Sequence, residues 1–151
     1  FIENEGPSLK PIKTESEVFE LQLKNNNVLE PVYECLNIVK SHLNHDKGLI
    51  GFAGGPLTIA AYMIEGKGSN TFSKCVSFFN NYEKTFIKLL KKLEIFITNH
   101  LIKQIEAGAD AVQIFESHAK IAVDNNKFRE FCIEPNNNIV KNIKKNIPIF
   151  P

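Results

Sequence analysis

Apolar residues recur every three or four positions along several stretches of the chain, the spacing that places them on one face of a helix. The strongest such pattern runs from Tyr82 to Glu106. Its stripe consists of Phe86, Leu90, Leu93, Ile97, Leu101 and Ile105. Gly108 follows where a glycine commonly caps a helix C-terminus. The pattern predicts one long helix over residues 82–106.

Two shorter helices are predicted before it. Thr14 precedes Glu17 by three positions, a capping-box pattern that predicts a helix through Leu21. A second helix is predicted from Pro31 to the polar stretch at residues 44–47. Its apolar positions at helical spacing are Val32, Cys35, Leu36, Val39 and Leu43.

Two further helical patterns flank the long one. Ser69 and Asn70 can cap a helix whose apolar face carries Phe72, Val76 and Phe79. The preceding Gly66-Lys67-Gly68 lacks Walker spacing and predicts a flexible connector rather than a phosphate loop. Residues 125–145 are helical in pattern up to Cys132, are interrupted near Pro135, and resume with Ile139 and Ile143.

A strand, a tight turn and a helix start are predicted between residues 49 and 65. An apolar run of strand length ends at Gly54-Gly55, and Pro56 suits the first helical position because its missing N–H has no partner there. Glycines let a ligand approach the backbone, and the unpaired N–H groups of the helix start favour an anion or a carboxylate. Thr58 and Tyr62 share one face of this helix.

A second buried strand is predicted over residues 109–115. Alternation points Ala111, Gln113, Phe115 and Ser117 one way and Val112 and Ile114 the other. The aliphatic pair suits packing against outer helices. The set that includes Ser117 is therefore expected to face the interior of a barrel, with Ser117 at the strand's C-terminal end.

Strands that alternate with helices over short connections predict an α/β fold with parallel strands, best interpreted as part of a (β/α)8 TIM barrel. Residues 1–2 and 147–150 read as the end of one more strand and the beginning of another. We expect residues 1–151 to be a single domain that is part of a longer chain. Made alone, such a piece is expected to expose strand edges.

Composition excludes some classes of function. The formal net charge of +1 gives no electrostatic reason to expect nucleic acid or an acidic membrane surface as a partner. No apolar run approaches the length of a membrane span, so we expect a soluble, cytoplasmic protein. Cys35, Cys75 and Cys132 fit neither a disulfide framework nor a paired zinc-ligand spacing, and we expect reduced, buried thiols.

The other titratable candidates have ordinary explanations. Glu116 and Asp110 are an even number of residues apart, so both are expected on the side of the strand that faces the helices. There, helix capping or ion pairing is expected rather than acid-base chemistry. His118 is expected to be structural. The remaining histidines, His42, His45 and His100, are expected to face solvent.

Residues 51–66, Gly-Phe-Ala-Gly-Gly-Pro-Leu-Thr-Ile-Ala-Ala-Tyr-Met-Ile-Glu-Gly, resemble the signature segment of the uroporphyrinogen decarboxylase family. Residues 1–7 resemble its Glu-x-Glu-Gly-Pro stretch, and Gln113-Ile-Phe-Glu-Ser-His-Ala119 resembles a later strand end. The resemblance covers nearly the whole chain but only a middle portion of the family's sequence.

The resemblance implies roles for three residues. Tyr62 matches the family's tyrosine beside the reacting acetate, where its phenol donates to a carboxylate or stabilises charge during loss of carbon dioxide. Ser117 matches a substrate-contacting hydroxyl residue, and Phe52 matches an aromatic residue that lines the pocket. Without the resemblance, Tyr62 and Phe52 read as packing residues and Ser117 as a helix cap.

The family's chemistry implies a carboxy-lyase without a cofactor or metal, acting on uroporphyrinogen as a homodimer in haem biosynthesis. A protonated pyrrole of the substrate accepts the electrons of the breaking bond. The family's paired arginines, pyrrole-facing aspartate and functional histidine are not matched in this chain. The alternative is a zinc-dependent corrinoid or thiol methyltransferase of the same barrel superfamily. Such an enzyme needs a His-x-Cys site, whereas Ala119 and Lys120 follow His118.

Two positions depart from the family's pattern. Lys120 stands where a glycine is usual, and Asn136 follows Pro135 where an aromatic residue is usual. Both are expected to affect the loop and helix beyond the second strand.

Overall fold

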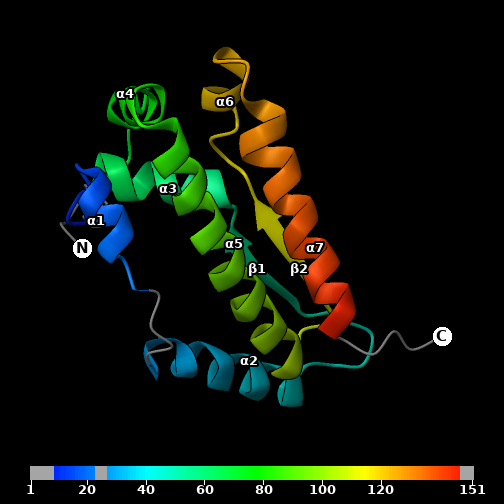
Figure 1. Ribbon diagram of the computed structural model, residues 1–151. Helices are drawn as coiled ribbons and strands as arrows, with labels where there is room; N and C mark the ends of the chain where they lie inside the picture. Colours follow the sequence, from blue (N-terminus) through cyan, green and yellow to red (C-terminus); the bar gives the residue numbers. More distant parts are fainter. Residues whose placement is uncertain (1–8, 23–26, 147–151) are drawn as a thin grey trace.

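The computed structural model describes residues 9–22 and 27–146 of the chain, a mixed arrangement of helices and strands (Figure 1). In chain order its elements are α1 (Glu15–Glu20), the 3-10 turn η1 (Asn27–Leu29), α2 (Glu30–His42), β1 (Ile50–Gly54), α3 (Pro56–Glu65), α4 (Ser73–Asn81), α5 (Glu83–Glu106), β2 (Ala111–Phe115), α6 (Lys120–Asp124), the π-helical turn η2 (Arg129–Ile133) and α7 (Glu134–Asn146).

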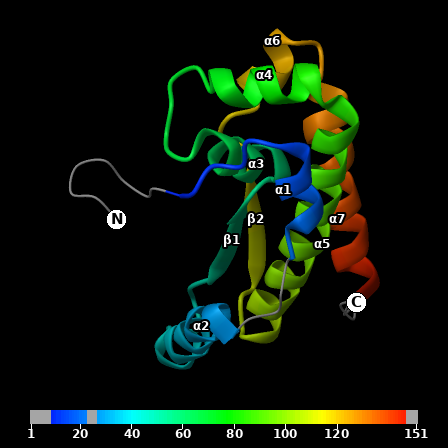
Figure 2. The same cartoon turned by 60° about the vertical axis from the view of Figure 1, so that its left-hand side comes forward.

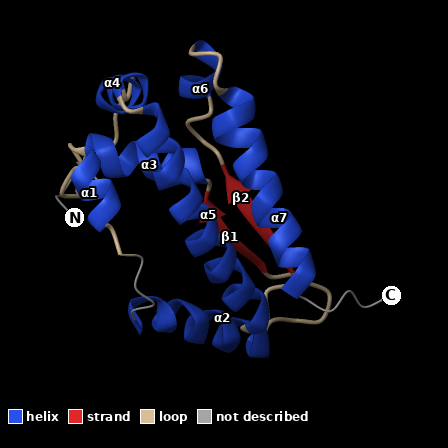
Figure 3. Cartoon of the chain, viewed as in Figure 1, coloured by secondary structure: helices blue, strands red, loops and turns tan. Residues whose placement is uncertain are grey.

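The two strands are parallel and adjacent (Figure 3). In their register Phe52 lies opposite Gln113. Helices α5 and α7 lie on one side of the strand pair (Figure 2). Val112 and Ile114 pack into the core, whereas Gln113 and Phe115 on the other side are exposed. The alternation predicted for β2 is therefore confirmed. The α/β class is confirmed as well, although two strands do not by themselves make a barrel.

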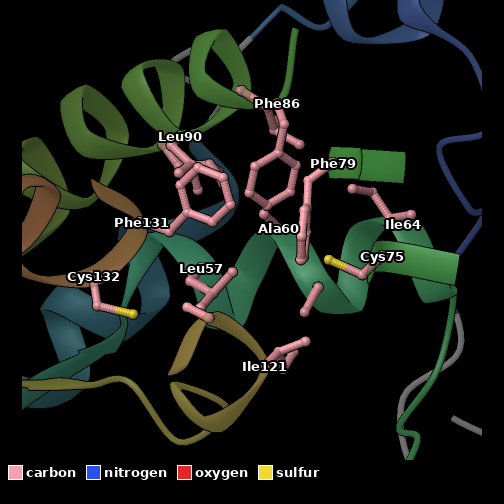
Figure 4. Close-up of a cluster of buried hydrophobic side chains, with 14 of the residues drawn as sticks. Leu57, Ala60, Ile64, Cys75, Phe79, Phe86, Leu90, Ile121, Phe131 and Cys132 are labelled. Atoms are coloured by element: carbon pink, nitrogen blue, oxygen red, sulfur yellow. The ribbon is translucent and has the colours of Figure 1, made fainter. Parts of the chain in front are cut away.

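The core lies where α3, α4, α5 and the η2 turn meet (Figure 4). Phe79, Phe86 and Phe131 form an aromatic triangle with ring centroids 4.9 to 5.5 Å apart. Leu57 and Ala60 of α3 are fully buried in the same cluster. This packing fixes α3, and hence the corner between β1 and α3, against the long helix.

Several local predictions are confirmed. The capping box of Thr14 and Glu17 begins α1, with both reciprocal hydrogen bonds present. Gly108 has a φ of 105° after the long helix. Gly66, with a φ of 86°, caps the C-terminus of α3, and its N–H donates to the Tyr62 carbonyl. The Gly66 turn is thus a helix end rather than a phosphate loop.

The helix predicted from Pro31 to residues 44–47 is confirmed as α2, although most of its apolar residues are not buried. Val32, Cys35 and Val39 are exposed, and Tyr33 is the residue that α2 buries. The helix lies at the opposite end of the strands from α4 and α6 (Figure 1), so its neighbours differ from those that its stripe suggested. The burial expected of Cys35 is wrong for the same reason, while Cys75 and Cys132 are buried as expected.

The region after β2 is wound differently from the predicted helix. A short helix, α6, comes first, and the π-helical turn η2 then leads directly into α7. Pro135 lies in the first turn of α7, where a residue without a backbone N–H is tolerated. The predicted interruption therefore takes the form of a wider helical turn.

The strand ends expected at residues 1–2 and 147–150 lie outside the described residues. Within the described part of the chain, every helix is too short or too polar to cross a bilayer.

Candidate functional site

The corner between β1 and α3 is closed by a carboxylate from the neighbouring strand. The Leu57 N–H donates to Glu116 Oε1 at 3.0 Å, and the Thr58 N–H and hydroxyl both donate to Glu116 Oε2 at 3.0 Å. The start of α3 therefore does bind a carboxylate, but one supplied by the chain itself. The expectation of a ligand site at these N–H groups is corrected accordingly.

Gly55 is explained by this carboxylate rather than by a ligand. A Cβ on Gly55 would lie 2.2 Å from Glu116 Oε1 and 2.3 Å from its carboxyl carbon. The φ of Gly55 is an ordinary −72°, so the absence of a side chain matters here for space and not for backbone conformation.

Glu116 is half-buried, and this burial raises its pKa, while the hydrogen bonds from Thr58 and Leu57 act in the opposite direction. Asn136 also donates to this carboxylate. The residue that departs from the family's pattern thus takes part in the cap of α3. The capping role expected for Glu116 is confirmed.

The ion-pairing role expected for Asp110 is also confirmed. Its carboxylate binds Lys40 Nζ at 2.6 Å and accepts a hydrogen bond from the Leu49 N–H at 2.8 Å. These contacts hold its pKa below the usual range, with the Leu49 N–H as the largest cause. Asp110 fastens the start of β1 to α2 and to the start of β2.

Tyr62 lies on α3, one turn beyond Thr58, and its ring is half-buried. It packs edge-on against Phe72, with ring centroids 5.5 Å apart, and at a tilt against His118, with centroids 5.4 Å apart. The centroids of the Phe72 and His118 rings are 4.4 Å apart. Phe72 has a φ of 48°, which is costly for a residue other than glycine, and Ser69 supports this turn by accepting the Phe72 N–H. The rings of Phe72 and His118 fix the orientation of the Tyr62 ring.

Ser117 is exposed beyond the C-terminal end of β2. It lines a hollow of about 380 Å³ with Phe72, His118 and Lys120. Tyr62 does not line this hollow and lies behind Phe72 and His118 instead. His118 is held by these rings, and burial lowers its pKa.

Phe52 lies in the middle of β1, and 63% of it is exposed on the open face of the strand pair. Its ring contacts Phe115 edge-on, with centroids 6.0 Å apart. Phe52 therefore belongs to the open sheet face with Phe115, whereas Tyr62 and Ser117 lie on either side of His118 near the C-terminal ends of the strands.

Sequence reasoning missed two residues that shape this region, Phe72 and Gln104. Nothing in the local pattern distinguishes Phe72 from an ordinary packing residue. Gln104 had a usable signal, because it continues the helical stripe three positions after Leu101 and yet is polar. The solvent-facing context expected for His100 is wrong, since its ring is half-buried and hydrogen-bonded to Tyr33 and Gln104.

The described side chains were also considered as possible metal ligands. Within residues 9–22 and 27–146, no group of three His, Cys, Asp or Glu side chains is placed to hold an ion. Burial raises the pKa of Cys75 and of Cys132 to about 12, which keeps both thiols protonated at neutral pH.

Residues 1–150 match the model of a family described as Uroporphyrinogen decarboxylase (URO-D). The chain belongs to the uroporphyrinogen decarboxylase family. Proteins named uroporphyrinogen decarboxylase from Wolbachia pipientis wMel, Rickettsia bellii (strain RML369-C) and Aliarcobacter butzleri (strain RM4018) are 40%, 42% and 39% identical to it. Each alignment covers 100% of this chain.

The chain spans less than half the length of these family members, 43% of the Wolbachia protein and 44% of the other two.

Proposed function

We propose that the complete protein containing this chain is a uroporphyrinogen decarboxylase, a carboxy-lyase that needs no cofactor. It removes carbon dioxide from the four acetate side chains of uroporphyrinogen III and yields coproporphyrinogen III. The observation that carries this proposal is the family match over residues 1–150, with relatives of that name about 40% identical.

The chain contributes part of a (β/α)8 barrel, as a single domain over residues 1–151. Three features support this: parallel neighbouring strands, helices on one side of them, and an apolar open side with exposed Ile50, Phe52 and Phe115. In a closed barrel this open side is the interior, and the C-terminal ends of the strands form the mouth.

The chemistry divides between substrate and protein. A pyrrole protonated at a ring carbon takes the electron pair of the breaking bond, and carbon dioxide leaves. The resulting methylene carbon is then protonated to a methyl group, while the proton on the ring carbon departs and the aromatic pyrrole is restored. Protein groups orient the tetrapyrrole and pair its carboxylates. The Tyr62 hydroxyl donates to the reacting acetate, Ser117 binds a second polar group of the substrate, and Phe52 provides an apolar wall with Phe115.

The geometry supports a preorganised tyrosine. Its ring is held by Phe72 and His118, so the hydroxyl has little rotational freedom to lose on binding. Within the described part of the chain that hydroxyl makes no hydrogen bond, which leaves its proton available to a substrate carboxylate.

The test is turnover by the complete protein. Purified protein incubated anaerobically with uroporphyrinogen III should release carbon dioxide and form coproporphyrinogen III without added metal or cofactor. Metal analysis of the same sample separates the methyltransferase alternative. Stoichiometric zinc together with no decarboxylation would contradict the proposal.

The complete protein is also proposed to form a homodimer, as the family resemblance implies. Light scattering after size-exclusion chromatography measures this directly, and a monomeric mass would contradict it.

A further inference from the structure

The hydroxyl of Thr58 contacts two different parts of the segment that follows β2. Thr58 is buried in the first turn of α3, with 9% of it exposed. Its hydroxyl donates to Glu116 Oε2 at 3.0 Å, and the His118 N–H donates to Thr58 Oγ1 at 3.4 Å. One side chain of α3 therefore binds the residues on both sides of Ser117.

The direction of these two hydrogen bonds follows from the groups involved. A backbone N–H can only donate, so the Thr58 oxygen accepts from His118. A hydroxyl has one proton and two lone pairs, which leaves that proton for the Glu116 carboxylate. Both bonds can therefore form at once, and valine in place of threonine would remove both while keeping the shape of the side chain.

These contacts limit where Ser117 can lie. On one side of it, the Gly55 N–H donates to the Phe115 carbonyl at 2.9 Å and joins the end of β2 to the corner before α3. On the other side, the Thr58 hydroxyl holds the His118 backbone. The chain between these two anchored positions is two residues long, so its path has little freedom.

Tyr62 lies on the same helix as Thr58. It follows Thr58 by four residues, about 6 Å along the helix axis, and shares its face. The fully buried Leu57 and Ala60 hold α3 in the core. A contact that fixes the segment after β2 against α3 therefore also sets the distance between Ser117 and Tyr62.

We propose that Thr58 is a positioning residue for Ser117. Its hydroxyl bridges the Glu116 carboxylate and the His118 backbone, and so fixes the segment between them relative to the helix that carries Tyr62. Both sides of the bridge lie at the carboxyl ends of neighbouring parallel strands, an arrangement that a closed barrel preserves. The effect on substrate binding rests on the proposed function, whereas the bridge itself does not.

Amide hydrogen exchange in the complete protein, resolved to single residues, tests the bridge. In Thr58→Val the His118 amide should exchange about tenfold faster or more, because its acceptor is gone. The Leu57 amide should keep its rate, since it donates to Glu116 Oε1 and not to Thr58. Unchanged protection of the His118 amide would overturn the proposal. Equal acceleration at Leu57 would also overturn it, because the hydroxyl would then only support the helix cap.

The wild-type protein provides a measurement that does not depend on the folding of a variant. Its His118 amide should exchange at least about tenfold more slowly than the same amide in an unstructured peptide. Exchange at the unstructured rate would overturn the proposal even if Thr58→Val did not fold. Thr58→Ser keeps the hydroxyl and should keep the protection of His118, and a loss of protection in Thr58→Ser would contradict the bridge.

Kinetics of uroporphyrinogen decarboxylation test the positioning role. Thr58→Val should raise KM about fivefold and leave kcat within about twofold, because a displaced Ser117 weakens binding more than it alters the reacting groups. Thr58→Ser should have the wild-type KM. The matched control is Thr98→Val on α5, whose buried hydroxyl donates to the Glu94 carbonyl at 2.7 Å, and it should change neither constant. Equal KM values for wild type and Thr58→Val would refute positioning.

A double variant shows whether Thr58 acts through Ser117. Ser117→Ala removes the hydroxyl that is proposed to bind the substrate, so adding Thr58→Val to it should raise KM by less than about twofold further. If the two effects multiplied instead, Thr58 would act on another group and the proposal would be overturned. A complete wild-type protein without decarboxylase activity would refute the proposed function and leave the exchange result standing.

Discussion

The side chains with a proposed chemical role are held by neighbours that come from other elements. Tyr62 of α3 is oriented by Phe72, which precedes α4, and by His118, which follows β2. A ring with fixed neighbours presents its hydroxyl in one direction at little entropic cost. The role of Tyr62 is therefore separable from its packing.

Tyr62→Phe keeps the ring contacts and removes only the hydroxyl. In the complete protein it should lower kcat for uroporphyrinogen about ten- to hundredfold, the range expected for losing one donor to developing charge. The control is Tyr82→Phe, since Tyr82 is an exposed tyrosine between α4 and α5. Unchanged kcat and KM in Tyr62→Phe would remove Tyr62 from the site.

His100 predicts a pH dependence of stability. Burial lowers its pKa from 6.5 in the folded protein, so the unfolded chain binds a proton that the folded chain does not. Its stabilising contribution is present above pH 6.5 and is lost as the pH falls below that value, by at most about 1.4 kcal/mol per pH unit. Protonation would also set an Nε2–H against the Gln104 amide.

Urea unfolding of the complete protein between pH 5 and pH 8 measures this effect. His100→Phe should flatten the decline of the free energy of unfolding on the acid side relative to wild type. Lys103, whose Nζ lies 5.1 Å from the Tyr33 ring centroid, remains charged throughout this range and does not add to the slope. If the free energy of unfolding declined equally with falling pH in wild type and in His100→Phe, His100 would not be the source of the pH dependence.

At the scale of elements, β1, α3 and β2 are joined by one carboxylate. Glu116 leaves the end of β2 and binds the first N–H groups of α3, which are otherwise without partners. The negative charge also lies at the positive end of the helix dipole. The corner between β1 and α3 thus depends on a residue 59 positions away from Leu57.

Glu116→Ala in the complete protein should lower the free energy of unfolding by about 2–3 kcal/mol, because it leaves the Leu57 and Thr58 N–H groups buried without an acceptor. Glu116→Gln keeps one carbonyl acceptor and should cost less. Glu106→Ala on the exposed side of α5 should stay within about 0.5 kcal/mol of wild type. Chemical denaturation measures all three, and an equal, small effect for the Ala and Gln variants would contradict the cap.

Gly55→Ala tests the same contact from the other side. Its Cβ would overlap the Glu116 carboxylate, so the loss should match that of Glu116→Ala at about 2–3 kcal/mol. Because both changes remove one interaction, the double variant should be little worse than either single variant. Additive losses would mean that Gly55 serves another purpose.

At the scale of the whole molecule, the strand pair has one covered side and one open side. Helices α5 and α7 cover the first (Figure 2), whereas Ile50, Phe52 and Phe115 are exposed on the second. A contiguous apolar surface of this kind is unfavourable in water and promotes association. The remainder of a complete barrel would cover it.

The 151-residue chain made alone should therefore self-associate and should lack decarboxylase activity. Size-exclusion chromatography and dye binding measure the first property, and a turnover assay the second. Replacing Phe52 and Phe115 together by lysine should reduce association, because the charges make the open side polar. A wild-type chain that stays monomeric with a sharp thermal transition would contradict this.

Much of the local structure could be predicted from the sequence. Three local features depend on spacings of at most four residues: the stripe of the long helix, the alternation of β2 and the glycine-proline corner. Such spacings can be read directly from the sequence. The candidate residues Tyr62, Ser117 and Phe52 could be named from the sequence only through the family resemblance, since each reads locally as packing or capping.

The sequence by itself determined the long helix, the two strands, and which side of β2 meets the helices. Only the tertiary structure decided that Glu116 caps the start of α3, that the Gln104 amide binds the Phe52 backbone, and that most of the apolar stripe of α2 is exposed. The reason is physical. Each of these depends on which distant backbone groups or surfaces come within a few ångströms, and the periodicity of a single element carries no information about its neighbours.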